Sequence, residues 1–502
     1  MGRRIRWVGV FMLLCFVALF VQLNNVQVAK AHAYATAKGN PRTTNAVAQD
    51  PRGVIQAADG TVLAESVPAP ANNAFGYKYQ RSYPQGSLYG DITGYDSPIY
   101  GNYTGIEASY NSYLQAHNAP LKTIGDLFST RVETDTVTLT VVPKLQQVAA
   151  QQLAPYDGGS AVVLDPSTGA IEAMYSNPAY NPNPLTSLNV ATERAAFKAD
   201  TAGNPGGPNY QPLQLLAYND TFPPGSSFKI VTTSAAYMHA PQLVTKPFPS
   251  YSCMPPGTIP GQTTVFCNYA NEYCGGAIAQ LLPPSCDSGY ALLSVAIGPQ
   301  NMYDEATAYG FDQQPPIDLP HGPGEVSQFG KVSDYTEPTG APIFLAFSGI
   351  GQKYTAATPL QMAMVAATVA NHGKEMVPHL MKTIRDQQGN LIKRYTPRVW
   401  KTPITPAVAT AITGLMRTVV TAPNGTGAGI GFNPADDVAG KTGTAQVGPN
   451  GQLTDDWFIA FAPASNPKVA VAVCVPNQPP GGTGAGEAGP IAKALITAAL
   501  GH

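Results

Sequence analysis

The sequence opens with a segment that assigns the rest of the chain to one side of a membrane. Arg3, Arg4 and Arg6 precede an almost unbroken apolar run from Trp7 to Leu23. Positive charge before such a run is typical of an N-terminus that stays in the cytoplasm. The run exceeds the roughly 7–15 apolar residues of a signal peptide and approaches the length of a membrane span. We therefore expect residues 1–28 to form a cytoplasmic tail and a single transmembrane helix, with the remainder outside the cell membrane.

A cleaved signal peptide is the alternative interpretation of this segment. Small-x-small triplets such as Ala31-His32-Ala33 follow the apolar run and suit a signal peptidase. Both interpretations place the body of the protein in an extracytoplasmic, oxidising compartment.

The length and charge of the chain limit its organisation and its partners. The 502 residues exceed what one compact core usually holds, so we expect a non-catalytic, β-rich module at 29–155 and a larger domain at 156–502. Charged residues make up only 12% of the chain and the net charge is −2, without a basic stripe. This composition excludes a nucleic-acid-binding protein.

The order of patterns in the larger domain predicts an α+β fold. A hairpin pattern at 158–175 comes first, because two apolar runs flank a turn rich in Pro and Gly. Helical patterns follow at 226–239, 289–297, 359–371 and 405–421; strand patterns at 438–447, 457–462 and 468–475; and a last helical pattern at 486–499. We expect an antiparallel sheet that joins both ends of the domain and is sandwiched by helices.

The cysteines predict a disulfide in one polar stretch. Cys253, Cys267 and Cys274 lie close together among Pro and Gly residues, and either Cys267–Cys274 or a bond from Cys253 to one of them fits. A zinc site lacks a C-x-x-C pair and a nearby histidine, so we expect no metal and no cofactor. Cys474, in an apolar alternation, is expected to be a buried thiol.

Ser226 and Lys229 form the first candidate pair for catalysis. Pro223-Pro-Gly precedes Ser226 and marks a helix start, and residues three apart share one face of a helix. Lys229 could then accept the hydroxyl proton if burial and a second cation lower its pKa. The N-terminus of the helix also offers N–H groups to a developing oxyanion. An ordinary helix-capping serine is the alternative, and Ser227 would cap equally well.

The S-x-x-K pattern alone is weak, because Ser465-Asn-Pro-Lys468 also matches it. Asn466-Pro467 lies between two strand patterns, so this second match is expected in a turn without the helical geometry.

Lys441-Thr442-Gly443-Thr444 strengthens the case for Ser226. It occurs once, at the start of a strand pattern, where alternation places Lys441 and Gly443 on one side and Thr442 and Thr444 on the other. Gly443, without a side chain, would let a substrate backbone lie close. A solvated lysine at an exposed strand start is the alternative.

A third element, S-x-[ND], fits Ser285-Cys-Asp287 before the helical pattern at 289–297. Tyr269-Ala-Asn271 is a rival in the same interval, but no helical pattern follows it. Ser109-Tyr-Asn111 and Ser187-Leu-Asn189 also match, yet both precede Ser226.

Together these motifs resemble the penicillin-recognising acyltransferases, whose S-x-x-K, S-x-N and K-T-G elements occur in this order. Within that family the chain is similar to the class B penicillin-binding proteins over nearly its whole length. The supporting segments are Arg52-Gly-Val-Ile, Asp59-Gly-Thr-Val-Leu-Ala64, Gly169-Ala-Ile-Glu-Ala-Met174, Ile350-Gly-Gln352, Thr358-Pro-Leu-Gln-Met362 and Trp457-Phe-Ile-Ala-Phe-Ala462.

The resemblance implies a peptidoglycan D,D-transpeptidase in which Ser226 attacks the D-Ala-D-Ala bond of a stem peptide and β-lactams acylate the same serine. It also implies that Lys441, Thr442 and Thr444 hold a substrate carboxylate. It further implies that the 29–155 module is a pedestal or dimerisation unit and that division-complex proteins are partners. A D,D-carboxypeptidase and a division scaffold with little catalysis remain the alternatives. Asp287 departs from the commoner Asn, and its charge would tend to raise the pKa of Lys229.

Overall fold

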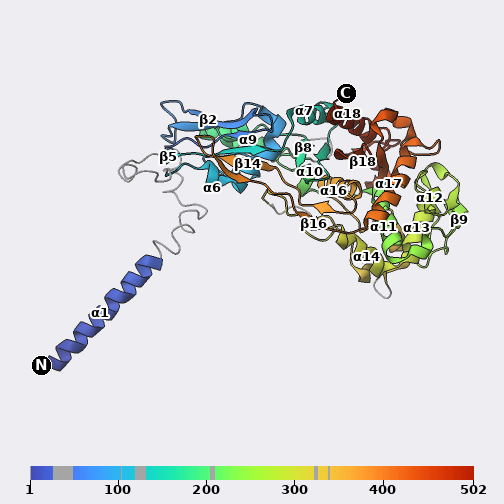
Figure 1. The fold of residues 1–502 in the computed structure, drawn as a ribbon, viewed down its shortest axis with the longest axis horizontal. Coiled ribbons are helices and arrows are strands. Elements are labelled where there is room, and N and C mark those ends of the chain that lie inside the picture. Colours follow the sequence, from blue (N-terminus) through green and yellow to red (C-terminus); the bar gives the residue numbers. More distant parts are fainter. Residues whose placement is uncertain are drawn as a thin grey trace.

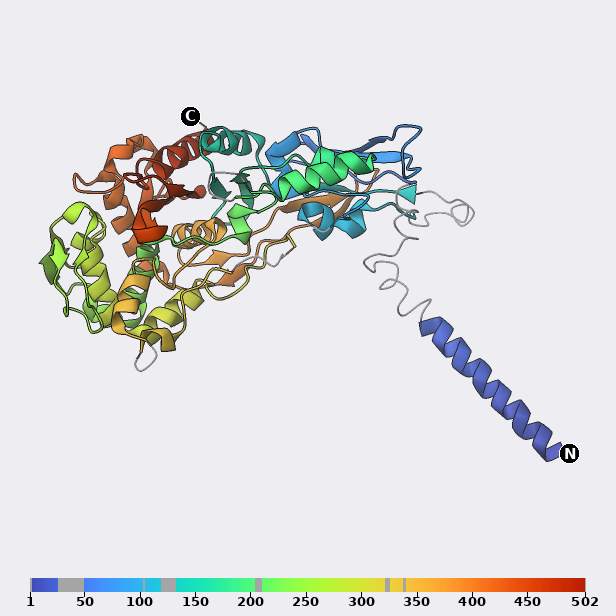
Figure 2. The same ribbon diagram turned by 180° about the vertical axis from the view of Figure 1, so that it is seen from behind.

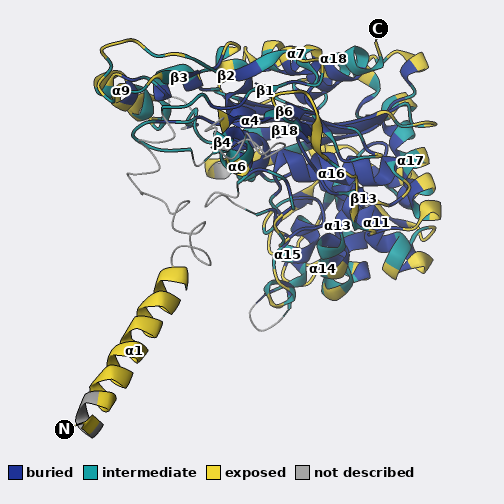
Figure 3. Cartoon of the chain, turned by 60° about the vertical axis from the view of Figure 1, so that its left-hand side comes forward, coloured by how far each residue is buried: buried dark blue, intermediate teal, exposed yellow. Residues whose placement is uncertain are grey.

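The computed structural model describes residues 2–25, 49–102, 104–118, 132–203, 210–320, 326–336 and 340–501. Helix α1 (Gly2–Asn24) stands apart from the body, and its large apolar side chains are exposed (Figure 1 and Figure 3). Its segment Arg6–Asn24, with a mean hydropathy of 2.1, is long and apolar enough to cross a membrane. The triplet Ala31-His32-Ala33 lies outside the described residues.

A five-stranded antiparallel sheet forms the centre of the larger domain and joins its two ends, as the sequence predicts. The strand order is β17-β18-β19-β7-β8. The hairpin β7–β8, which comes first in the chain, joins the C-terminal strands β17–β19 because β19 pairs with β7. The bounds are β7 Gly159–Leu164, β8 Ile171–Asn177, β17 Ala439–Val447, β18 Leu453–Ala462 and β19 Val469–Gln478.

Helices cover both faces of this sheet, which confirms the expected α+β sandwich. Helices α7 (Pro143–Leu153) and α18 (Ala488–Leu500) pack on one face through Leu153 and Leu495. Helix α16 (Pro359–Ala370) lies on the other, and every residue in it is buried, as its continuous apolar sequence requires. Helix α17 (Pro406–Thr421) packs against β17.

Helix α11 follows the nucleophile candidate and packs against α13, α14 and α17 (Figure 1). The bounds of the helices in this part of the domain are α10 Leu216–Asn219, α11 Lys229–His239, α12 Ile278–Leu281, α13 Asp287–Ile297, α14 Pro299–Ala308 and α15 Pro342–Ser348. Four short pairing strands lie nearby, β9 Phe248–Tyr251, β10 Cys253–Met254, β11 Phe266–Cys267 and β12 Cys274–Gly276.

A second sheet lies at the far end of the molecule and draws on distant parts of the chain. Its order is β15-β14-β6-β1-β2-β3, and β14 pairs antiparallel with β6 (Figure 2). The bounds are β1 Ile55–Gln56, β2 Val62–Pro68, β3 Tyr79–Ser82, β6 Thr136–Leu139, β14 Met381–Arg385 and β15 Leu391–Arg394. Strands from 381–394 thus complete a sheet of the N-terminal module, while the domain limits at 28 and 155 stay predictions.

Short elements complete the described fold. They are α4 Gly90–Thr93, α5 Gly105–Ser109, α6 Asn111–Leu114, α8 Pro182–Leu185, α9 Val190–Asp200, β4 His117–Asn118, β5 Val132–Glu133, β13 Glu375–Met376 and β16 Val399–Lys401.

In the N-terminal module, the buried carboxylate of Glu107 accepts hydrogen bonds from Arg52 Nε at 2.5 Å and Arg81 Nε at 2.6 Å, which pairs all three charges away from water.

Candidate active site

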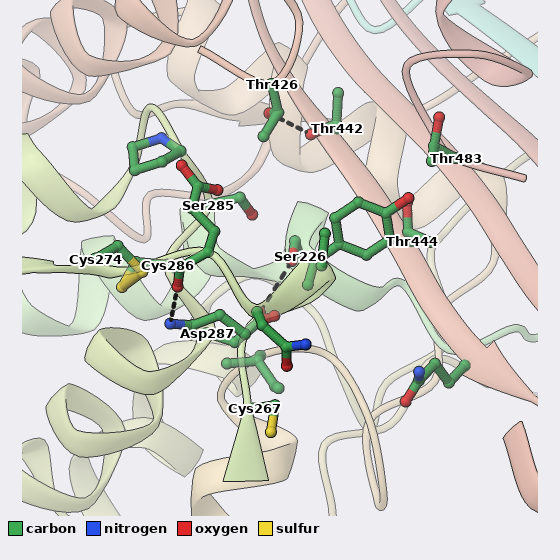
Figure 4. A pocket seen from close by; sticks show the side chains of 18 of the residues that line it. Ser226, Cys267, Cys274, Ser285, Cys286, Asp287, Thr426, Thr442, Thr444 and Thr483 are labelled. Atoms are coloured by element: carbon green, nitrogen blue, oxygen red, sulfur yellow. Dashed lines mark hydrogen bonds between the residues drawn. A yellow bond between two sulfur atoms is a disulfide. The ribbon is translucent and has the colours of Figure 1, made fainter. Parts of the chain in front are cut away.

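Ser226 lies in a tight turn that leads into helix α11. Residues Gly225–Phe228 form one 3₁₀ turn, and the α-helix itself begins at Lys229. Gly225 has φ +51°, and an added Cβ would lie 2.9 Å from Ala445 N, so the turn presses directly on strand β17. Ser227 Oγ donates to Pro224 O at 2.7 Å. Because Ser227 closes the turn, the Ser226 side chain is left to face the cavity beside it (Figure 4).

Lys229 is fully buried behind Ser226 and is held by three acceptors. Its Nζ donates to Asp287 Oδ1 at 2.6 Å, to Ser285 O at 2.7 Å and to Ser285 Oγ at 3.2 Å. Burial lowers the pKa of Lys229, and the Asp287 carboxylate opposes that shift. The Ser226 hydroxyl donates to the same Asp287 oxygen at 3.4 Å.

Ser285 joins the lysines of the two motifs. Its Oγ accepts from Lys441 Nζ at 2.8 Å as well as from Lys229 Nζ. The residue has φ +60°, a left-handed conformation in which non-glycine residues are uncommon, two positions before Asp287 opens helix α13. Such backbone strain is retained where the surroundings enforce it.

Lys441 is also fully buried, and its Nζ donates to Thr442 O at 2.9 Å. Burial and, after it, the charge of Lys229 hold the pKa of Lys441 well below its usual value, against the opposing Asp287 charge. Two ammonium groups this close favour the loss of one proton. The site therefore favours one neutral amine over two ammonium groups.

Strand β17 presents the other K-T-G residues as alternation predicts. Thr442 and Thr444 line the cavity (Figure 4). Thr442 Oγ1 lies 2.6 Å from Thr426 Oγ1, and Thr444 Oγ1 accepts from Gly484 N at 3.0 Å. An added Cβ on Gly443 would lie 2.5 Å from Pro224 O and 3.2 Å from Ser227 Cβ. A side chain at position 443 would therefore collide with the turn Gly225–Phe228 and the residue before it, and this requirement for glycine was not evident from the sequence.

A cavity of about 1140 Å³ opens over Ser226. Thr426, Thr442, Thr444 and Thr483 line one side of it, and residues 265–272 line another. Its volume is ample for an extended peptide. Thr426 and Thr483 were not expected at the site, because nothing local in their sequence marks them, whereas the loop at 265–272 contains the rival motif Tyr269-Ala-Asn271.

The described cysteines form two disulfides, Cys253–Cys267 and Cys274–Cys286. The expectation of a bond from Cys253 to Cys267 is confirmed, whereas Cys274 pairs with neither of them, so that part of the prediction is wrong. Cys286 was not expected as a partner, because it lies inside the S-x-D motif. Cys474 is a buried free thiol, as expected.

The competing motif matches lie elsewhere or make different contacts. Ser465 is exposed in the turn between β18 and β19, where its N–H donates to Asp437 Oδ2 at 2.8 Å. Tyr269 and Asn271 line the cavity, but Tyr269 is 61% exposed. No group of three or more His, Cys, Asp and Glu residues suited to a metal occurs among the described residues.

Comparison with known proteins gives the same family for nearly the whole chain. Residues 159–497 match the penicillin-binding protein transpeptidase domain, and residues 52–133 match the penicillin-binding protein A dimerisation domain. The chain is 34% identical to the peptidoglycan D,D-transpeptidase PbpA of Mycolicibacterium smegmatis and 32% identical to that of Mycobacterium tuberculosis, covering 100% of this chain and 99% of each relative. It superposes on M. tuberculosis penicillin-binding protein A, solved as a ceftriaxone acyl-enzyme, with a TM-score of 0.79 and 31% identity over 91% of this chain and 100% of that one.

Proposed function

The chain belongs to the penicillin-binding proteins with a transpeptidase domain, and we propose that Ser226 is the nucleophile of that domain. The protein is a peptidoglycan D,D-transpeptidase, a serine-type acyltransferase that β-lactams acylate. One observation supports the site above all others. Ser285 Oγ lies 2.8 Å from Lys441 Nζ and 3.2 Å from Lys229 Nζ, so the three motifs share one hydrogen-bonded group beside Ser226.

The hydroxyl groups of strand β17 are suited to the donor stem peptide. Its terminal carboxylate would bind Thr442 and Thr444, with the charge of Lys441 behind them. The oxygen of the scissile carbonyl would then face the N–H groups of Ser226 and Thr444, which stabilise negative charge as it develops.

Acylation then moves one proton and exchanges one bond. Ser226 Oγ attacks the carbonyl carbon of the penultimate D-Ala as its proton passes to the neutral amine of Lys229. The C–N bond breaks, and the leaving amine takes the same proton from Lys229 through Ser285 Oγ, which releases D-Ala. An amine of a second strand attacks the resulting ester, loses its proton to the site and restores Ser226.

Labelling with a fluorescent penicillin tests the nucleophile. Ser226→Ala should abolish covalent labelling, whereas Ser465→Ala, which alters the other S-x-x-K match, should label at the wild-type rate. Labelling that persists without Ser226 would refute the assignment.

Incubation with a D-Ala-D-Ala stem peptide and an amine acceptor separates two activities of the same acyl-enzyme. A cross-linked product is expected for the transpeptidase. Release of D-Ala without cross-linked product would identify a D,D-carboxypeptidase instead.

The location and cellular role extend this proposal. Helix α1 supports a retained single-pass anchor, with residues 1–28 as tail and anchor, 29–155 as a pedestal or dimerisation module and 156–502 as an extracytoplasmic catalytic domain. We also propose a role in cell division, with division-complex proteins as partners. A chromosomal Ser226→Ala allele distinguishes catalysis from scaffolding, since a pure scaffold would still support division.

A further inference from the structure

The cavity has two chemically different sides, and the proposed function uses only one of them. The threonines of and around β17 suit the carboxylate of the donor. The loop at 265–272 also lines the cavity and carries Glu272 as its carboxyl group. Transpeptidation needs a second peptide at the same ester, and that peptide brings an amine that is cationic at neutral pH.

The loop is rigidly joined to the catalytic residues. Asn268 Nδ2 donates to Tyr251 O at 2.6 Å and to Glu272 O at 2.8 Å, and its Oδ1 accepts from Ser288 N at 2.7 Å. Ser288 follows Asp287 in helix α13. The two disulfides fix the chain on both sides of the loop. A surface held in this way is preorganised for binding.

The loop also has an unusual backbone conformation. Ala270 has φ +50° and Asn271 has φ +57°, so two successive non-glycine residues are left-handed immediately before Glu272. Tyr269 and Tyr273, on either side, are 61% and 74% exposed. Exposed aromatic side chains on a rigid loop beside a catalytic cleft are typical of a binding surface.

The backbone N–H and carbonyl of Glu272 are hydrogen-bonded within the loop, and the residue lines the cavity. Its N–H donates to Tyr269 O at 3.1 Å and its carbonyl accepts from Asn268, while the residue itself is exposed. Partial burial and, after it, repulsion by Asp287 raise the pKa of Glu272. Glu272 and Asp287 both line the cavity, and a cation bound beside Glu272 would offset the repulsion between the two carboxyl groups.

We propose that residues 269–273 form the acceptor subsite, in which Glu272 attracts the side-chain ammonium group of the second stem peptide. This inference rests on the proposed function and adds the residues that bind the acceptor. Glu272 positions the amine, and a group nearer Ser226 removes its proton before attack on the ester.

The test uses the full-length protein in detergent, with a D-Ala-D-Ala stem pentapeptide as donor. Two acceptors are compared: a stem peptide with a free side-chain amine, and hydroxylamine, which is mostly uncharged at neutral pH. The readout is the ratio of aminolysis to hydrolysis of the acyl-enzyme. Glu272→Gln should lower this ratio about threefold to tenfold for the cationic acceptor and leave it unchanged for hydroxylamine.

Matched variants distinguish the effect of the Glu272 charge from a general structural effect of the substitution. Glu272→Asp should restore part of the ratio, and Glu65→Gln, on strand β2 of the N-terminal module, should change nothing. Added salt should lower the ratio in the wild type more than in Glu272→Gln. An unchanged ratio in a Glu272→Gln protein that still labels with penicillin would overturn this inference alone, whereas loss of labelling or cross-linking in the wild type would overturn the proposed function.

Discussion

Lys229 and Asp287 form an ion pair of 2.6 Å, and the same carboxylate oxygen accepts from the Ser226 hydroxyl at 3.4 Å. The pair has two opposite consequences. Burial lowers the pKa of Lys229 and prepares a neutral amine, while the adjacent negative charge favours the ammonium form. The sequence indicated this conflict through the Asp in place of Asn, and the structure shows that both effects act on one amine.

Asp287→Asn should shift the pH dependence of acylation. The amide keeps the shape of the side chain but removes the charge that raises the pKa of Lys229. The neutral amine then persists at lower pH, so the acidic limb of the rate profile should move to lower pH. The measurement is the second-order rate of fluorescent-penicillin labelling across a pH series.

Asp437→Asn is the control, because Asp437 forms an ion pair of equal length with Arg417 away from the cavity. Its profile should match the wild type. If the acidic limb of Asp287→Asn does not move while the rate collapses, Asp287 and not Lys229 is the proton acceptor.

Gly443→Ala should disturb the nucleophile turn. The new Cβ would lie 2.5 Å from Pro224 O, so either β17 or the turn must shift. Overpacking of this kind costs about 1–3 kcal/mol, and displacement of the turn should slow acylation at the same time. Thermal unfolding and penicillin labelling measure the two effects.

Gly414→Ala is the matched glycine control for this change. Gly414 lies within helix α17 and an added Cβ meets nothing within 4 Å. The helix should gain about 0.5–1 kcal/mol with no change in labelling. Equal behaviour of the two variants would contradict the packing argument.

The parts of the site that were predictable are those with local patterns. Pro-Pro-Gly before Ser226 predicted a helix start, and strand alternation placed Thr442 and Thr444 together. The contact of Ser285 Oγ with both lysines required α13 and β17 to meet, and no local pattern carries that information. The same holds for Cys286, whose partner Cys274 depends on how the loop folds back. The pairing of β14 with β6 joins residues about 240 apart, so a division of the chain into consecutive segments could not predict it.

The two disulfides should contribute similarly to stability but differently to catalysis. Their sequence separations are 14 and 12 residues, for which loop closure predicts about 3 kcal/mol each. Cys286 lies between Ser285 and Asp287, so Cys274→Ala/Cys286→Ala should slow acylation at least about tenfold. Cys253→Ala/Cys267→Ala should lose comparable thermal stability and keep most of the acylation rate. An equal loss of rate in both pairs would show that general loosening, and not the position of Ser285, controls acylation.

Glu305 should make the protein less stable as the pH rises. Burial raises the pKa of its carboxyl from 4.5 to about 8, and Oε1 has no hydrogen-bond partner, although Oε2 lies 2.9 Å from His239 Nε2. The folded state therefore holds this proton more tightly than the unfolded chain does. The resulting stability is fully present below pH 4.5 and is lost as the pH rises to about 8. Glu305→Gln cannot ionise, so its melting temperature should fall less than that of the wild type over this interval. An equal fall in melting temperature in the two proteins across the pH series would show that Glu305 ionises in the folded state as readily as in the unfolded chain.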